Sequence, residues 1–308
     1  MKKLLIILML FSVFSSAFAN KNEQQIEQDS SYHFSINLTQ VKDDKLKVEL
    51  ITPKIEKDEI SYFLPKIIPG TYSIYDFGRF VSDFKAFDTE GKELKVSQKG
   101  DNEWAISEAK KLHKISYWSE DTYDTKQDNF VFEPAGTNII EKENFILNAN
   151  GFFGYFSDMK RNNYALTFIK PEGFYGATSL IASSSDATKD VYNVSDYHLL
   201  VDSPMMFSQP DTTVLNVGGA EIVIAVYSPN DILKSTDVAE SLTELLEAQK
   251  NYLGGALPIK KYAFIIYLFS GNSGSGSMGA LEHSHSSLYY LPEAPPQYLM
   301  PTIVDVSA

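Results

Sequence analysis

The sequence of 308 residues contains no cysteine. This absence excludes disulfide bonds, cysteine nucleophiles, thiolate-bound metals and a lipid-modified N-terminal cysteine. Any metal site must therefore use histidine, aspartate or glutamate, and the whole chain has only five histidines.

Basic residues are also few, because 27 lysines and arginines stand against 40 aspartates and glutamates, for a formal net charge of −13. Nucleic-acid binding requires a basic surface that neutralises phosphates. The composition therefore predicts no nucleic-acid partner. The acidic excess favours solubility and says little about the substrate.

Long apolar runs are absent except at the N-terminus, where Lys2 and Lys3 precede apolar residues 4–14 and small residues ending at Ala19. This order is typical of a secretory signal peptide over residues 1–19, cleaved near Ala19. The alternative is an uncleaved anchor, but the run is shorter than the roughly 20 residues of a spanning helix. We expect export to the periplasm or the medium, without stable membrane insertion.

Residues 31–200 show the period-two alternation of half-buried strands. Phe34, Ile36 and Leu38 share one face, whereas Ser35 and Asn37 occupy the other. Short strands without intervening helices predict an antiparallel β-sandwich-like domain. The other predicted strands are residues 45–50, 60–64, 80–87, 93–96, 103–106, 112–118, 164–169 and 197–201.

Residues 201–308 change to a strand–helix–strand order. An amphipathic helix is predicted over residues 236–253, between strands at 221–227 and 262–269. A further strand precedes this unit at 213–217 and another follows it at 286–291. The fold class is therefore mainly β with an α/β part, and a chain of this length is expected to form two domains.

A glycine-rich stretch from Gly274 to Gly279 matches G-x-G-x-x-G after a predicted strand. A dinucleotide-binding fingerprint also needs a helix directly after the loop. Here residues 286–291 read as another strand, so the pattern favours a flexible connecting loop over a nucleotide site.

The densest group of polar residues is Glu282-His283-Ser284-His285. On a continuous strand, His283 and His285 would share a face and Glu282 would point the other way. A shared metal is one interpretation, although it lacks a third ligand. The other is a loop in which one histidine forms hydrogen bonds and the other faces solvent, while Glu282 projects into a cleft and meets a substrate cation.

An aromatic run extends from Phe152 to Phe156. Core packing is its first interpretation, and a sugar or peptide platform is the second. Such a platform would suit the alternative function for this sequence, a secreted non-catalytic β-sandwich that binds peptides or glycans.

Four stretches together resemble the glycyl aminopeptidase family of zinc metallopeptidases, in the gluzincin group. The similarity extends from about Ser31 to the C-terminus, and the order and spacing of the stretches carry it. They are residues 64–81, with Pro69-Gly70-Thr71-Tyr72 and Phe77-Gly78-Arg79-Phe80; residues 84–104, with Phe84-Lys85-Ala86-Phe87-Asp88, Gly91 and Trp104; Leu200-Val201-Asp202-Ser203-Pro204; and Gly279-Ala280-Leu281-Glu282-His283.

The resemblance implies a role for the last stretch. In the wider group, the corresponding segment is an edge strand beside the active-site cleft. Its backbone aligns the peptide substrate by strand addition, and its glutamate binds the substrate's α-amine. Carried over, Gly279, Ala280 and Leu281 become the aligning edge and Glu282 the amine anchor, although leucine and histidine replace the usual methionine and asparagine.

The family's next landmark is H-E-x-x-H on a helix, where both histidines bind zinc. No such motif occurs in this sequence. Residues 301–308 resemble the first turns of that helix, with Pro301 at its start, so we expect a chain that stops within a thermolysin-like catalytic domain beginning at residue 201. The complete enzyme would be a zinc aminopeptidase acting on peptides, whereas this chain would hold no catalytic residue and no metal.

Overall fold

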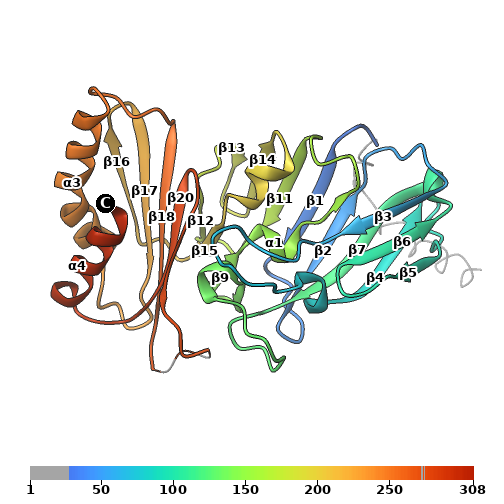
Figure 1. Ribbon diagram of the computed structural model, residues 1–308, viewed down its shortest axis with the longest axis horizontal. Coiled ribbons are helices and arrows are strands. Elements are labelled where there is room, and N and C mark those ends of the chain that lie inside the picture. Colours follow the sequence, from blue (N-terminus) through green and yellow to red (C-terminus); the bar gives the residue numbers. More distant parts are fainter. Residues whose placement is uncertain (1–27, 272, 274) are drawn as a thin grey trace, which may run out of the picture.

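The computed structural model describes residues 28–271, 273 and 275–308. The predicted signal peptide lies outside these residues. The molecule consists of successive layers (Figure 1): helices α3 and α4, a five-stranded sheet, a small four-stranded sheet, and a two-sheet sandwich at the opposite end. Within the described residues, no helix is long and apolar enough to cross a membrane.

The sandwich is formed by a seven-stranded sheet of order β13-β14-β11-β1-β2-β7-β4 and a four-stranded sheet of order β10-β3-β6-β5. All neighbours are antiparallel except β1 and β11. The bounds are β1 Tyr32–Asn37, β2 Lys45–Ile51, β3 Glu59–Phe63, β4 Val81–Asp88, β5 Val96–Gln98, β6 Glu103–Ser107, β7 Leu112–Glu120, β10 Tyr155–Phe156, β11 Tyr164–Ile169, β13 Ala182–Ser185 and β14 Lys189–Val194. Short helical turns connect them: η1 Phe77–Phe80, η2 Ala109–Lys111, η3 Glu133–Ala135 and α1 Ala149–Phe152.

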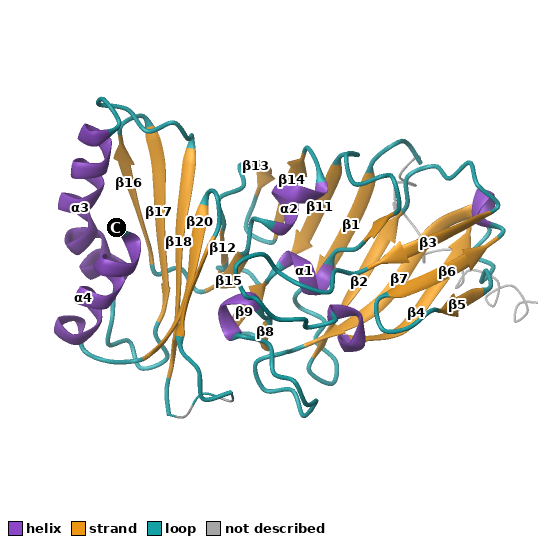
Figure 2. Ribbon diagram, in the orientation of Figure 1, coloured by secondary structure: helices purple, strands orange, loops and turns teal. Residues whose placement is uncertain are grey.

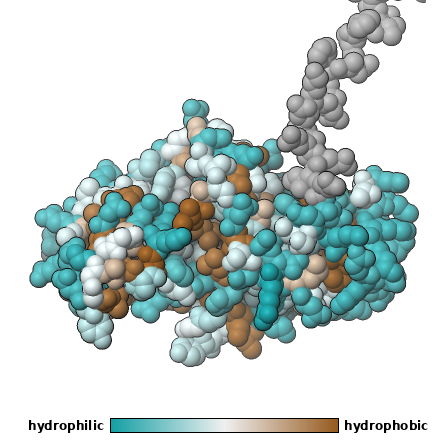
Figure 3. Space-filling view, turned by 90° about the horizontal axis from the view of Figure 1, so that it is seen from above, coloured by the Kyte–Doolittle hydropathy of each residue, from teal (hydrophilic) through white to brown (hydrophobic). Residues whose placement is uncertain are grey.

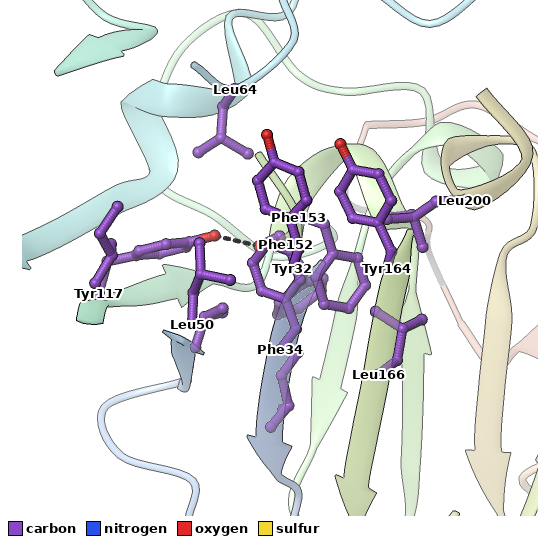
Figure 4. Close-up of a cluster of buried hydrophobic side chains, with 14 of the residues drawn as sticks. Tyr32, Phe34, Leu50, Leu64, Tyr117, Phe152, Phe153, Tyr164, Leu166 and Leu200 are labelled. Carbon is purple, nitrogen blue, oxygen red and sulfur yellow. Dashed lines mark hydrogen bonds between the residues drawn. The ribbon is translucent and has the colours of Figure 1, made fainter. Parts of the chain in front are cut away.

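Large aromatic side chains fill the sandwich (Figure 4). The rings of Tyr32 and Tyr164 stack with centroids 4.4 Å apart. Buried hydroxyls need partners, and Tyr117 donates to the carbonyl of Phe152 at 2.5 Å. Phe152 and Phe153 are themselves fully buried, so the aromatic run belongs to the core, as its first interpretation predicts.

A small sheet of order β12-β15-β9-β8 joins the sandwich to the rest of the chain. Its inner strands, β15 and β9, are buried on both faces. Phe145 and Phe207 pack into the sandwich core. Ile146 and Met206 point to the other face and pack against the five-stranded sheet. The bounds are β8 Asn138–Ile140, β9 Asn144–Leu147, β12 Tyr175–Ala177 and β15 Met205–Ser208. Because β15 pairs with β9 and β12, this sheet uses residues on both sides of position 200. The predicted boundary at 200/201 stays a prediction.

The five-stranded sheet has the order β16-β17-β18-β20-β19, and helices α3 and α4 cover one of its faces (Figure 2). Strands β17, β18 and β20 are parallel, and α3 is the crossover between β17 and β18. The bounds are β16 Thr212–Val217, β17 Ala220–Tyr227, α3 Ser235–Tyr252, β18 Lys261–Phe269, β19 Gly279–Glu282, β20 Ser286–Pro292 and α4 Pro296–Ser307. The predicted fold class, mainly β with an α/β part, is confirmed.

Three predicted elements are wrong in detail. The strand predicted over residues 93–96 overlaps the observed one only at its last residue, because β5 is Val96–Gln98. Residues 197–201 form helix α2 (Tyr197–Val201) rather than a strand, because the Asp196 carboxylate caps it by accepting from the Leu199 amide at 2.9 Å. The last helix begins at Pro296 rather than at Pro301, which lies inside α4.

The face drawn in Figure 3 is largely hydrophilic. On this face, apolar side chains gather mostly in the middle of the molecule and at the end away from the sandwich.

Candidate functional site: an edge strand at the interface between the sheets

Strand β19, which carries Gly279 to Glu282, lies at the outer edge of the five-stranded sheet. It pairs only with β20 among the strands of the described residues. A tight turn joins the two strands, in which the His283 amide donates to the Ser286 carbonyl at 2.8 Å. The resemblance implies an edge strand, and this is where the structure places one.

The hydrogen bond of the turn determines which backbone groups of β19 are free. Along an antiparallel pair, successive residues point their amide and carbonyl alternately toward and away from the partner strand. The backbone amide of His283 points toward β20. The backbone amides and carbonyls of Leu281 and Gly279 therefore point toward β20 as well. The amides and carbonyls of Ala280 and Glu282 therefore face the open edge, which narrows the predicted aligning edge to these two residues.

The side chains of β19 also alternate between the two faces of the sheet. Leu281 is buried against the sandwich side, in a cluster with Ile68 and Phe77. Glu282 points to the other face and is exposed. The carboxylate of Glu282 thus lies at the open edge, where a ligand could reach it.

The motif segment of residues 66–80 packs directly against β19. A Cβ placed on Gly70 would lie 3.5 Å from Leu281 Cδ1. The loop closes on itself, because the Lys66 carbonyl accepts from the amides of Tyr75 at 2.7 Å and Asp76 at 3.0 Å. Two stretches that are distant in the sequence therefore form one surface.

A second loop, residues 127–132, is tied to the first. Arg79 donates to the carbonyls of Tyr75 and Asp128, both at 2.7 Å. The Asn129 side chain donates to the Ile74 carbonyl at 3.1 Å. These bonds hold both loops beside β19, where a Cβ on Gly279 would lie 3.0 Å from Cζ of Phe132.

The serine-rich loop before β19 is anchored by Glu133, a side chain that sequence reasoning missed. Its carboxylate is buried and accepts from the hydroxyls of Ser273 at 3.0 Å and Ser277 at 2.8 Å, and also from the hydroxyl of Ser275. A strand, and not a helix, follows the loop, so the nucleotide fingerprint lacks its helix N-terminus. Gly274 lies outside the described residues.

The turn after β19 is held by Asp202, at the C-terminal end of α2. Its carboxylate lies 3.1 Å from His283 Nδ1 and accepts from the Ser284 amide at 3.0 Å. Burial raises the pKa of Asp202, but the hydrogen bonds from His283 and Ser284 outweigh this effect and hold the pKa below its ordinary value. The two motifs containing Asp202 and His283 thus meet in space.

The proposed histidine pair is not found on one strand. His283 and His285 both lie in the turn between β19 and β20, and His283 already faces Asp202. Among the described residues, the only group of three side chains arranged for a metal is Asp44, Asp121 and Asp124. Catalytic zinc sites use histidine ligands. The residues present therefore do not fit a catalytic zinc ion.

This layout can be compared with known proteins. Residues 33–209 match the Peptidase M61 N-terminal domain. The chain belongs to the peptidase M61 family. The matched region of this M61 chain includes the loops at 66–80 and 127–132, Glu133 and Asp202, while β19 lies beyond it. No curated protein matches the chain.

Two solved structures can be compared with the chain, and the first of them is similar in fold. An aminopeptidase N family protein from Idiomarina loihiensis superposes with a TM-score of 0.70 at 18% identity, over 84% of this chain and 42% of its own. An M1 zinc metallopeptidase mutant from Deinococcus radiodurans gives a TM-score of 0.44 at 10% identity, over 85% of this chain and 60% of its own. The M61 chain therefore spans less than half the length of the first structure.

Proposed function

We propose that this M61 chain supplies the substrate-aligning edge of an exported zinc aminopeptidase of the glycyl aminopeptidase type, with residues 201–308 as the start of its thermolysin-like catalytic domain. One observation carries the proposal. The backbone amides and carbonyls of Ala280 and Glu282 face the open edge of β19, and the exposed carboxylate of Glu282 lies at the same edge. An extended peptide can add to such an edge as a further strand.

Glu282 then determines which end of the peptide binds. A carboxylate at the end of the strand forms a charge-assisted hydrogen bond with a free α-amine, which a blocked N-terminus cannot provide. Because the amine lies at the Glu282 end, the peptide runs from Glu282 toward Gly279, antiparallel to β19.

Zinc belongs to the proposal for the complete enzyme. No H-E-x-x-H motif occurs in the 308 residues, and the cluster of Asp44, Asp121 and Asp124 among the described residues contains carboxylates only. We propose zinc as the metal of the complete enzyme, and we assign substrate binding, without turnover, to this chain.

Peptide binding to the chain without its signal tests the assignment. We expect ligand-observed NMR titration to show binding of Gly-Leu-Ala-amide and at least about tenfold weaker binding of its N-acetylated form, because one charge-assisted hydrogen bond is lost. The variant Glu282→Gln should weaken binding of the free peptide by a similar factor.

The exposed Glu240 on α3 provides a matched control, and Glu240→Gln should leave binding unchanged. Equal affinity for the free and acetylated peptides would contradict the amine-anchor role. A peptide or glycan that binds the sandwich without involving β19 would instead support the alternative of a non-catalytic binding protein.

A further inference from the structure

Several large apolar side chains remain exposed around β19. Tyr72 is 100% exposed and Ile74 62%, and both lie on the loop whose Ile68 shares a buried cluster with Leu281. Phe130 on the second loop and Met278 directly before β19 are 51% and 64% exposed. These exposed side chains belong to segments next to a sheet edge with free backbone groups, so they are available to a ligand that binds along that edge.

The loop that carries Tyr72 is held in a fixed shape. Thr71 closes a turn through its amide and hydroxyl, which donate to the Ile68 carbonyl at 3.3 and 2.8 Å. Tyr72 itself has a φ of 55°, a left-handed conformation that is unfavourable for an aromatic residue. The fold thus presents the ring to solvent despite a cost in backbone energy.

Strand geometry determines which part of a bound peptide meets this loop. Residues directly opposite each other in an antiparallel pair have their side chains on the same face. If the first peptide residue lies opposite Glu282, the second lies opposite Leu281. Its side chain then points to the sandwich side, where Leu281 shares a buried cluster with Ile68 and a Cβ on Gly70 would lie 3.5 Å from Leu281 Cδ1.

We propose that residues 67–74, with Tyr72 and Ile74, form an apolar wall that receives the second side chain of an extended peptide bound along β19. This wall deepens the proposed function and rests on it. It makes the sandwich domain a determinant of sequence preference, selecting the residue after the N-terminal one, while Glu282 recognises the amine.

The test compares Gly-Leu-Ala-amide with Gly-Ser-Ala-amide on the chain without its signal, by ligand-observed NMR titration. Partial burial of the leucine side chain should make the first peptide bind about tenfold more tightly. In the double variant Tyr72→Asn, Ile74→Ser the preference should fall to about twofold. Asparagine tolerates the left-handed conformation, so the loop should keep its shape.

Tyr252 on α3 offers a matched control, since it is also an exposed tyrosine, at 91%, and lies on a different element. Tyr252→Asn should preserve the tenfold preference. Amine-dependent binding with no preference for leucine, or a preference that the double variant retains, would overturn the apolar wall but leave the proposed function intact. If neither peptide binds, the proposed function fails and the wall fails with it.

Discussion

Asp202 and His283 are 81 residues apart in the sequence, yet Asp202 Oδ1 lies 3.1 Å from His283 Nδ1. The same carboxylate accepts from the Ser284 amide through its second oxygen. This contact fastens the turn of the β19–β20 hairpin to the end of α2. The Asp202 carboxylate therefore helps to hold the proposed substrate edge in place relative to the sandwich.

We expect Asp202→Asn to lower the free energy of unfolding by roughly 1–3 kcal/mol, because an amide has one acceptor oxygen where the carboxylate has two. The pKa of Asp202 is lowered in the folded state, so its stabilising effect is present above the unfolded pKa of about 3.9 and disappears as pH falls through the folded pKa. Urea unfolding between pH 3 and 7 measures both effects. The surface variant Asp158→Asn should change neither, and an unchanged acid sensitivity in Asp202→Asn would contradict this account.

Glu133→Ala should loosen the loop before β19, because the hydroxyls of Ser273, Ser275 and Ser277 lose their common acceptor. The three serines are only half-buried, so each lost hydrogen bond should cost about 0.5–1.5 kcal/mol. Hydrogen exchange should be faster at the amides of Ser275 and Ser277 than in the unmodified chain. Glu141→Ala, at an exposed position, serves as the control, and unchanged exchange in Glu133→Ala would show that the carboxylate does not anchor the loop.

Gly78→Ala should be among the most damaging single substitutions, because a Cβ there would lie 2.0 Å from the carbonyl oxygen of Asp101. The Gly78 amide also donates to the Asn102 side chain at 2.9 Å, which fixes the start of η1. We expect a loss of more than about 3 kcal/mol or failure to fold. Gly219→Ala has open space around the new methyl group and should cost only about 1–2 kcal/mol for its positive φ. Similar thermal unfolding of the two variants would refute the steric argument.

The raised pKa of Asp121 predicts a second pH dependence of stability, opposite in sign to that of Asp202. Burial, together with the nearby Asp124 and Asp44, raises the pKa of Asp121 to about 8, although hydrogen bonds from the Tyr123 and Ile139 amides oppose the shift. A raised folded pKa means that the stabilising effect is present below the unfolded pKa, about 3.9, and is lost as pH rises toward 8. Stability should therefore decline between pH 4 and 8 from this group, and Asp121→Asn should flatten that part of the profile. If the decline in stability persists in Asp121→Asn, another titrating group causes it and this prediction is wrong.

Much of the fold can be predicted from the sequence where local pattern dominates. The alternation of Phe34 and Ile36 with Ser35 is sufficient to place β1, because a half-buried strand requires period two. Helix α3 differs from its predicted range by one residue at each end. The pattern of residues 197–201 does not distinguish the two structures, since their apolar run fits a short strand equally well and only the cap provided by Asp196 decides for a helix.

The candidate site divides in the same way. By itself the sequence determined the family-like motifs, the absence of cysteine and of H-E-x-x-H, and the candidate residues Gly279 to Glu282. Only the tertiary structure decided that Ala280 and Glu282 face the open edge, that Gly70 abuts Leu281, and that Asp202 and Glu133 hold the segments on either side of β19. The physical reason is that strand register and buried hydrogen bonds join residues far apart in the chain, and no local pattern encodes such pairings.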